Sequence, residues 1–371
     1  MSRRLPCVLT LTFLMPALAS AQTSARATFE SLAQPNVPSD PLELVPADAQ
    51  PVQNAEQRAA AVNLLDLAHA LSNVRAQAYH LKTTLTVAGS SYDGTWTLDD
   101  ISPSHGVYRW TAQGPSYSVV NLYTGGMLYS SQPSGGLPLR LAQARAALFF
   151  NYAAIGPHAL VRTAQASLNG GQLNCVTFER NSRAKPVAGG RRWVDSEYCA
   201  DAHSGVLTTW SPSPGVYVLY DYSSAINFHG KTIPNGFTIS EAGRTVVEAH
   251  VESVTDPGSP DAALFEPSGL TQTGVGSFMS QPWHVWDFVG NPKSARNGEL
   301  QAVVVHGMVT PAGELTETEV VASSSQNLNQ KALDLATKNT ASWHGDDDAQ
   351  PGATPQAREV FYLVQFAGPG A

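Results

Sequence analysis

The chain has 371 residues, of which 43% are hydrophobic and only 14% charged, and its formal net charge is −8 at pH 7. A net negative charge argues against nucleic acid or an anionic membrane as the main partner. The 30 Gly and 25 Pro indicate many turns, which favours β structure over helical bundles, and the length suggests two folded domains.

The first 21 residues have the three parts of a signal peptide. Arg3 and Arg4 precede an apolar run, and Ala19-Ser20-Ala21 offers a cleavage site. The run is shorter than the roughly 20 residues of a membrane-spanning helix, and Pro16 interrupts it. The sequence therefore predicts export to the periplasm of a Gram-negative-type envelope, with residues 1–21 removed. The alternative is that the segment is kept as an anchor, and membrane association is expected only in that case.

The next stretch, residues 22–54, is rich in Pro, Ala, Ser and Asp and is predicted to be a flexible leader. A helix is predicted from Glu56 to Val74, because apolar side chains recur at steps of three and four residues. The residues of this predicted apolar face are Ala60, Leu64, Leu67, Ala68 and Leu71.

From Gln77 to Glu252 the apolar pattern has a period of two, with Gly-rich turn signals between short runs. One helical stretch, Leu141 to Ala153, interrupts about ten predicted strands and is apolar over most of its surface. The predicted fold class is therefore mainly β. We expect a large, bent antiparallel half-barrel over residues 55–267, with helices on its concave face.

Two cysteines, Cys175 and Cys199, remain once the predicted signal peptide with Cys7 is removed. Both lie in strand-like segments, and the centre of a hairpin pairing them falls at Val187, between Pro186 and Gly189. Facing positions on paired strands bring Cβ atoms close enough to bridge, so the spacing predicts one disulfide. Two free buried thiols are the alternative.

The C-terminal part is predicted to be a second, smaller domain. Residues 268–298 are expected to form a linker, in which Trp283, Trp286 and Phe288 either pack or form a ligand cage. Residues 299–371 show the order β-β-α-β. The four predicted elements are Gln301 to Val309, Leu315 to Val321, a helix capped at Ser323, and Glu359 to Phe366.

This C-terminal pattern resembles the TonB C-terminal domain family. The matching pieces, in order, are Val303-Val304-Val305, Gly313, Val320-Val321, Ser323-Ser324, Trp343, Pro351-Gly352 and Val364-Gln365-Phe366. The resemblance implies that a peptide from an envelope protein or outer-membrane receptor adds to an edge strand of the small sheet. The docking edge it implies is the last strand, made of Val360, Phe361, Tyr362, Leu363, Val364, Gln365 and Phe366. Ordinary pairing within the sheet is the alternative. An anchored energy transducer would further require that residues 1–21 are retained.

The β domain resembles the half-barrel of the periplasmic lipoprotein carriers. The resemblance rests on the opening helix, the strands Ala78 to Val87 and Gly94 to Asp99, and an inner helix near Ala146. It implies an apolar cavity that holds an acyl chain, and the alternative is a solid core filled by its own side chains.

The sequence contains no catalytic motif of the common hydrolase, metalloprotease or phosphate-binding types. Its ten histidines are scattered, and Asp346-Asp347-Asp348 is better explained as a solvated acidic turn than as a cation site. We therefore expect no metal, no cofactor and no enzymatic activity. The favoured function is a periplasmic, TonB-like binding protein with an apolar-ligand-binding β domain, and a lipid or glycan hydrolase is the alternative.

Overall fold

The structure, a computed structural model, describes residues 44–45, 49–88, 92–132, 137–149, 155, 159–179, 195–275, 285–289, 300–323, 326–340 and 358–367. The predicted signal peptide, most of the leader, Trp343 and the acidic run 346–348 lie outside these residues. Among the described residues, no helix has the length and apolar character needed to cross a membrane.

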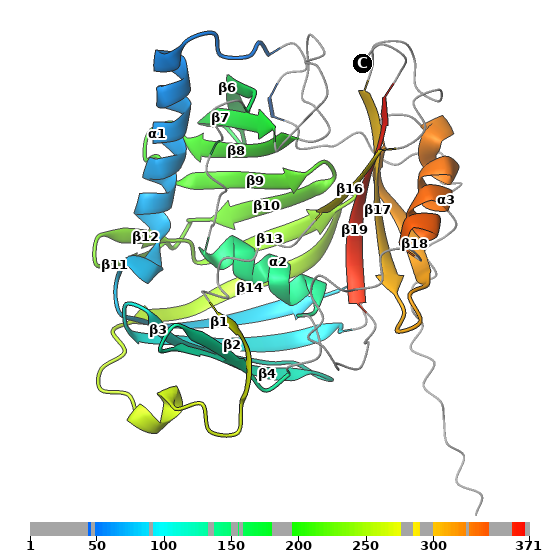
Figure 1. Cartoon of the computed structure of the whole chain (residues 1–371). Helices are drawn as coiled ribbons and strands as arrows, with labels where there is room; N and C mark the ends of the chain where they lie inside the picture. Colours follow the sequence, from blue (N-terminus) through cyan, green and yellow to red (C-terminus); the bar gives the residue numbers. More distant parts are fainter. Residues whose placement is uncertain are drawn as a thin grey trace, which may run out of the picture.

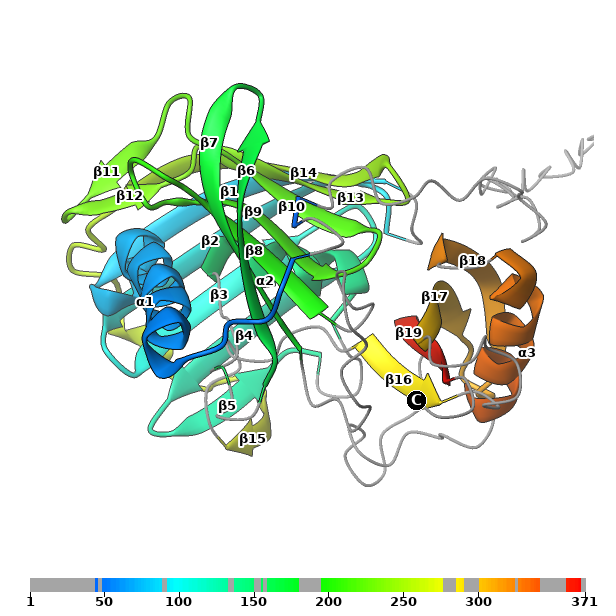
Figure 2. The same cartoon turned by 90° about the horizontal axis from the view of Figure 1, so that it is seen from above.

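A single 13-stranded sheet makes up most of the molecule, and its strands all pair antiparallel (Figures 1 and 2). Its strand order is β15-β5-β4-β3-β2-β1-β14-β13-β10-β9-β8-β7-β6. The sheet is open and strongly bent, which confirms the predicted half-barrel. The strands are β1 (Tyr79–Val87), β2 (Gly94–Ser104), β3 (Val107–Gln113), β4 (Ser118–Thr124), β5 (Met127–Ser130), β6 (Val161–Leu168), β7 (Gly171–Glu179), β8 (Asp195–Asp201), β9 (Leu207–Ser213), β10 (Val216–Asp221), β13 (Gly236–Glu241), β14 (Arg244–Thr255) and β15 (Thr271–Val275). A separate hairpin joins β11 (Ile226–Phe228) to β12 (Lys231–Ile233).

Two-residue turns explain how so many short strands pair in register. Gly125-Gly126 joins β4 to β5, and Asn169-Gly170 joins β6 to β7. All four residues have positive φ, which type I′ turns require and which matches the twist of the flanking strands. Part of the high glycine content of the sequence therefore lies in hairpin turns.

Two helices lie on the concave side of this sheet (Figure 2). The first, α1 (Ala55–Ser72), begins at Asn54, whose side chain accepts a hydrogen bond from the Gln57 amide. It buries Ala61, Leu65 and Ala68. Of the predicted apolar face, Ala68 is therefore buried, whereas Leu67 is 52% exposed. The second, α2 (Leu139–Phe149), is almost wholly buried and contacts β13, β14 and β19.

The small sheet has the order β16-β19-β17-β18. Its strands are β16 (Val285–Val289), β17 (Leu300–Val309), β18 (Leu315–Ser323) and β19 (Arg358–Ala367), and α3 (Asn329–Thr340) follows β18. The order of β17, β18, α3 and β19 is the predicted one. The strands β15 and β16 come from the segment 268–298 that was predicted to be a linker.

The prediction that the last strand is an exposed edge is wrong. β19 pairs antiparallel with β17 on one side and parallel with β16 on the other, so its backbone groups have partners on both sides. Its side chains are also buried on both faces. Val360, Tyr362, Val364 and Phe366 belong to the core under α3, whereas Phe361 and Leu363 belong to the core shared with the large sheet.

The two sheets contact each other directly. The β9–β10 turn approaches β18 so closely that a Cβ on Gly215 would lie 2.8 Å from the Ala322 Cβ and 2.9 Å from the Val321 carbonyl oxygen. A second contact, between the β13–β14 turn and β18, is the ion pair of Arg244 with Glu319.

Candidate ligand-binding face

The concave face of the large sheet is formed by the inward side chains of its strands. These side chains are mostly large and apolar, because the period-two pattern places one side of every strand inward. Members from across the sheet are Leu85, Trp96, Trp110, Tyr198, Trp210 and Val247, each at most 2% exposed. The two helices and this face share one hydrophobic core.

Three aromatic rings form a stacked row on neighbouring strands of this face. The Phe178 and Tyr198 ring centroids are 5.4 Å apart with planes 4° from parallel, and those of Tyr198 and Trp210 are 6.3 Å apart with planes 14° from parallel. Such a row presents flat, polarizable surface of the kind that alkyl chains and rings pack against.

One arginine of α2 reaches an acid on the floor of the concave face. The Arg145 guanidinium pairs with both carboxylate oxygens of Asp100, at 2.9 Å each. It also lies over the Trp110 ring, 3.8 Å from its centroid. Burial raises the pKa of Asp100, and the charge and hydrogen bonds of Arg145 oppose that increase without cancelling it.

A second arginine of α2 lies where the two sheets meet. Arg140 pairs with Glu241, which also accepts a hydrogen bond of 3.0 Å from the Gln143 amide. His306 of β17 stacks on Phe361 and has its Nδ1 atom 3.9 Å from the other Glu241 oxygen. Burial alone would raise the pKa of Glu241, but Arg140 and then His306 lower it more, so the net shift is downward.

These contacts describe a helix that is held by buried charges as well as by apolar packing. The side chains that α2 buries include the polar Arg140, Gln143 and Arg145 together with apolar Leu139, Leu141, Ala144, Ala146, Ala147 and Phe149. Buried ion pairs add little net stability compared with apolar packing, because both charges must be desolvated. When such a helix leaves the sheet, its charged groups regain water, which offsets part of the cost of exposing its apolar side chains. The arrangement is suited to a displaceable cover.

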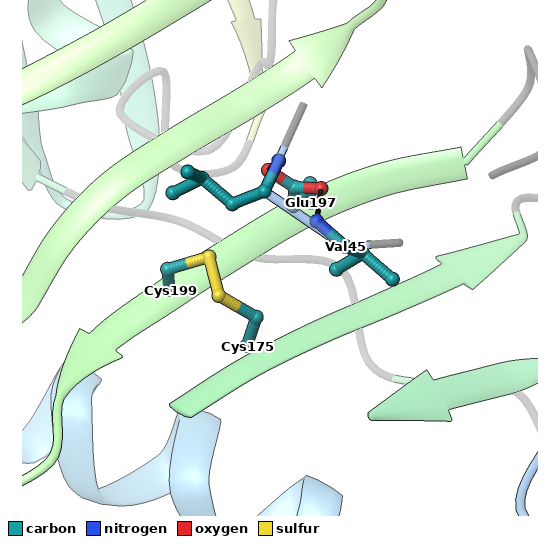
Figure 3. The surroundings of a disulfide bond; sticks show 5 residues. Val45, Cys175, Glu197 and Cys199 are labelled. Carbon is teal, nitrogen blue, oxygen red and sulfur yellow. Dashed lines mark hydrogen bonds between the residues drawn. A yellow bond between two sulfur atoms is a disulfide. The ribbon is translucent and has the colours of Figure 1, made fainter. Parts of the chain in front are cut away.

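The disulfide lies on the opposite, outer face of the sheet (Figure 3). Cys175 and Cys199 face each other on β7 and β8, and their S–S bond confirms the predicted pairing. Val45 packs against them, and the buried Glu197 carboxylate accepts hydrogen bonds from the amides of Leu44 and Val45, at 3.2 and 3.1 Å. Further along, the Val52 amide donates to the Val161 carbonyl on β6 at 2.8 Å. The end of the predicted leader is therefore part of the fold.

The sequence reading missed the residues that hold α2. Asp100 follows Trp96 and Leu98 at the inward spacing of β2, and Arg140 and Arg145 interrupt an otherwise apolar helix, so the pattern did carry a signal. Charges at inward positions are rare unless they are paired. The side chains of Trp283, Trp286 and Phe288 lie outside the described set, so neither interpretation of them is tested. Among the described residues, no three His, Cys, Asp or Glu side chains gather as metal ligands would.

Comparison with known proteins gave structural matches only. No family model matches the chain, and no curated protein does. A LolA superfamily protein from Nitrosomonas europaea matches with 11% identity and a TM-score of 0.38, over 56% of this chain and 97% of that one. A DUF1329 family protein from Desulfovibrio piger matches with 7% identity and a TM-score of 0.37, over 57% and 98%. The Pseudomonas aeruginosa MucA/MucB complex matches with 12% identity and a TM-score of 0.26, over 57% and 63%.

Proposed function

We propose that this chain is an envelope protein that carries or senses a lipid-like ligand. The large sheet binds the acyl chain of that ligand on its concave face, beneath α2. The observation that supports this most is the way α2 covers the face. Part of a surface of large apolar side chains is covered by a helix that two buried ion pairs anchor, Arg145 with Asp100 and Arg140 with Glu241.

A location outside the cytoplasm is part of this proposal. It is supported by the signal-like residues 1–21 and by the Cys175–Cys199 disulfide, since such bonds persist in oxidising compartments. Mass spectrometry of the N-terminus of protein from the envelope fraction tests it. Cleavage after Ala21 is the expected result. An N-terminus that still begins at Met1 would instead indicate that residues 1–21 are kept as an anchor.

Binding is tested on the full mature chain with a fluorescent acyl ester as the probe. We expect one probe per chain by native mass spectrometry. We also expect faster amide hydrogen exchange in α2 than in the strands beneath it, because the helix must open to admit the chain. Absence of probe binding at concentrations below the probe's own aggregation would refute the proposal.

A double variant and its control test the role of α2 as a cover. Asp100→Leu with Arg145→Met replaces a buried ion pair by apolar side chains of similar volume, which is neutral or stabilising in other proteins. Probe association and dissociation should both slow, because α2 is then held by apolar contact. Asp99→Asn is the control, since Asp99 neighbours Asp100 but lies half-exposed on the other face, paired with His80 at 2.8 Å. A double variant that exchanges probe like the control would contradict a role for α2 as a cover.

Strand addition to the small sheet is proposed as a second function. The supporting observation is that β16, an extended segment from elsewhere in the chain, already pairs with β19 over Val285–Val289. An envelope peptide would bind there only by replacing β16. A labelled peptide of residues 283–291 should bind a full chain carrying Asp287→Pro more tightly than it binds the wild type, because proline disrupts the strand backbone. Equal binding to both would refute replacement.

A further inference from the structure

Four side chains form a row across neighbouring strands of the concave face. Asp100 on β2 faces Trp110 on β3, Trp110 faces Asn121 on β4, and Asn121 faces Ser130 on β5. Residues that face each other across strands point to the same side of a sheet. Trp110 is part of the concave core, so all four side chains point toward that core, and all are buried.

Three of the four side chains are polar on a face that is mostly apolar, and the hydrogen bonding of the row is incomplete. Asp100 is paired with Arg145, and the Ser130 hydroxyl oxygen accepts a hydrogen bond of 3.0 Å from the backbone N–H of Gln132. The side-chain nitrogen of Asn121, which is 2% exposed, has no hydrogen-bond partner among the described residues. Buried polar groups almost always have a partner, and leaving one without is costly. The unpartnered side-chain nitrogen of Asn121 therefore points to a hydrogen-bond acceptor that a ligand supplies.

A second group on the same face shows the same feature. Thr83 of β1 faces the core residue Leu98 and is 2% exposed, and within the described part of the chain its hydroxyl also lacks a partner. Both groups can donate a hydrogen bond, so a ligand that carries acceptor oxygens would satisfy them.

The charges beside Asn121 limit what the acceptor is. The Arg145 guanidinium lies over Trp110, the ring between Asp100 and Asn121, and its charge is neutralised by Asp100. The Arg145–Asp100 pair therefore has no net charge to offer an anion. A free carboxylate placed there would be buried without a counter-charge, whereas an ester or amide carbonyl carries no charge to desolvate.

We propose that Asp100, Trp110, Asn121 and Ser130 form a head-group subsite that binds the neutral carbonyl of an acyl ester or acyl amide. Asn121 donates a hydrogen bond to the carbonyl oxygen, and the alkyl chain extends over the apolar side chains of the concave face. This inference rests on the proposed acyl-binding function and adds the class of ligand. Esters are the linkage of glycerolipids and amides that of N-acylated chains, so the two sources share this chemistry.

The test uses four probes of equal chain length that displace a fluorescent acyl reporter from the full mature protein: methyl palmitate, N-methylpalmitamide, palmitate and hexadecane. The wild type should bind the ester or the amide about tenfold more tightly than hexadecane or palmitate, as one satisfied hydrogen bond in a dry site predicts. Whichever of the two binds better identifies the source of the ligand.

Two substitutions separate the roles of the residues. Asn121→Leu, or Asn121→Val should the first fail to fold, should reduce ester and amide binding to the level of hexadecane and leave hexadecane binding unchanged. Asp100→Asn leaves the Arg145 charge uncompensated, so palmitate should gain at least fivefold relative to the ester. Asp99→Asn, on the outer face, should change neither preference.

The outcomes distinguish this subsite from the function on which it rests. Ester binding that survives Asn121→Leu, or a wild type that does not distinguish the ester from hexadecane, overturns the subsite while leaving acyl binding in place. Failure of every probe to displace the reporter, or of the reporter to bind, overturns both.

Discussion

Replacing Arg140 with methionine removes the guanidinium that faces Glu241 but keeps an unbranched side chain that fills much of the same space. Arg140 and Glu241 are both almost completely buried, so the variant leaves a carboxylate without its main partner. Breaking a buried pair in this way typically costs about 3–5 kcal/mol. Gln143 keeps its hydrogen bond of 3.0 Å to Glu241, which favours the lower end of that range, about 3 kcal/mol at pH 7.

The pH dependence of this loss is the sharper part of the prediction. In the wild type the folded pKa of Glu241 lies below its unfolded value, so this group stabilises the fold above the unfolded pKa. That contribution is lost as the pH falls through the folded pKa. In Arg140→Met, burial is left without its main opponent and should raise the folded pKa above the unfolded one. The group then favours unfolding increasingly as the pH rises from the unfolded pKa, so the variant's deficit should shrink on acidification.

Urea denaturation at pH 7.5 and pH 5 measures both effects. Arg244→Met is the matched control, because it breaks the neighbouring interface pair with Glu319 at a half-exposed arginine. It should cost less than about 1 kcal/mol. A loss below about 1 kcal/mol for Arg140→Met, or the same loss at both pH values, would show that Glu241 is not held as a buried charge.

Three further outcomes follow from single contacts. Replacing Cys175 and Cys199 with serine should cost about 3.5 kcal/mol in chemical denaturation, as the loop of 24 residues predicts on the chain-entropy model, and an unchanged midpoint would contradict it. Gly215→Ala should lower the thermal midpoint more than Gly230→Ala. The two glycines have almost the same positive φ, 77° and 75°, but of the two only Gly215 would bring its new Cβ within 3 Å of another strand. Tyr220→Phe removes the hydrogen bond of 3.0 Å to the Ala147 carbonyl and should speed amide exchange in α2 several-fold, with no change expected in α1.

The parts of the fold that the sequence predicted are those with local, repeated signals. The inward alternation of Trp96 and Leu98, the paired cysteines and the β-β-α-β order of the last segment all have such signals. The strand Val285–Val289 had none, because its pairing with β19 is parallel and non-local and its neighbours are rich in Gly and Ser. The last strand was accordingly predicted to be an edge when it is not.

The candidate site was harder to predict than the fold for a related reason. Asp100 and Arg145 are 45 residues apart, and neither residue can be recognised as part of a buried ion pair without the other. Periodicity places Asp100 inward, yet only the packing of α2 shows that a partner is there. Asn121 likewise becomes notable through its missing partner, which is a property of the folded structure alone.

The order of the large sheet has a consequence for how the chain assembles. It consists of two meanders, β1–β5 and β6–β14, in which nearly all pairing is between successive strands, and they meet only where β1 pairs with β14. That seam joins residues such as Leu85 and Ala249, far apart in sequence, so loop closure should delay it relative to either meander. Because α2 contacts β14, the helix lies beside the last junction to close. Pulse-labelled hydrogen exchange during refolding should protect the β7–β10 amides before those of β1 and α2. Simultaneous protection would mean that the half-barrel instead folds as one cooperative unit.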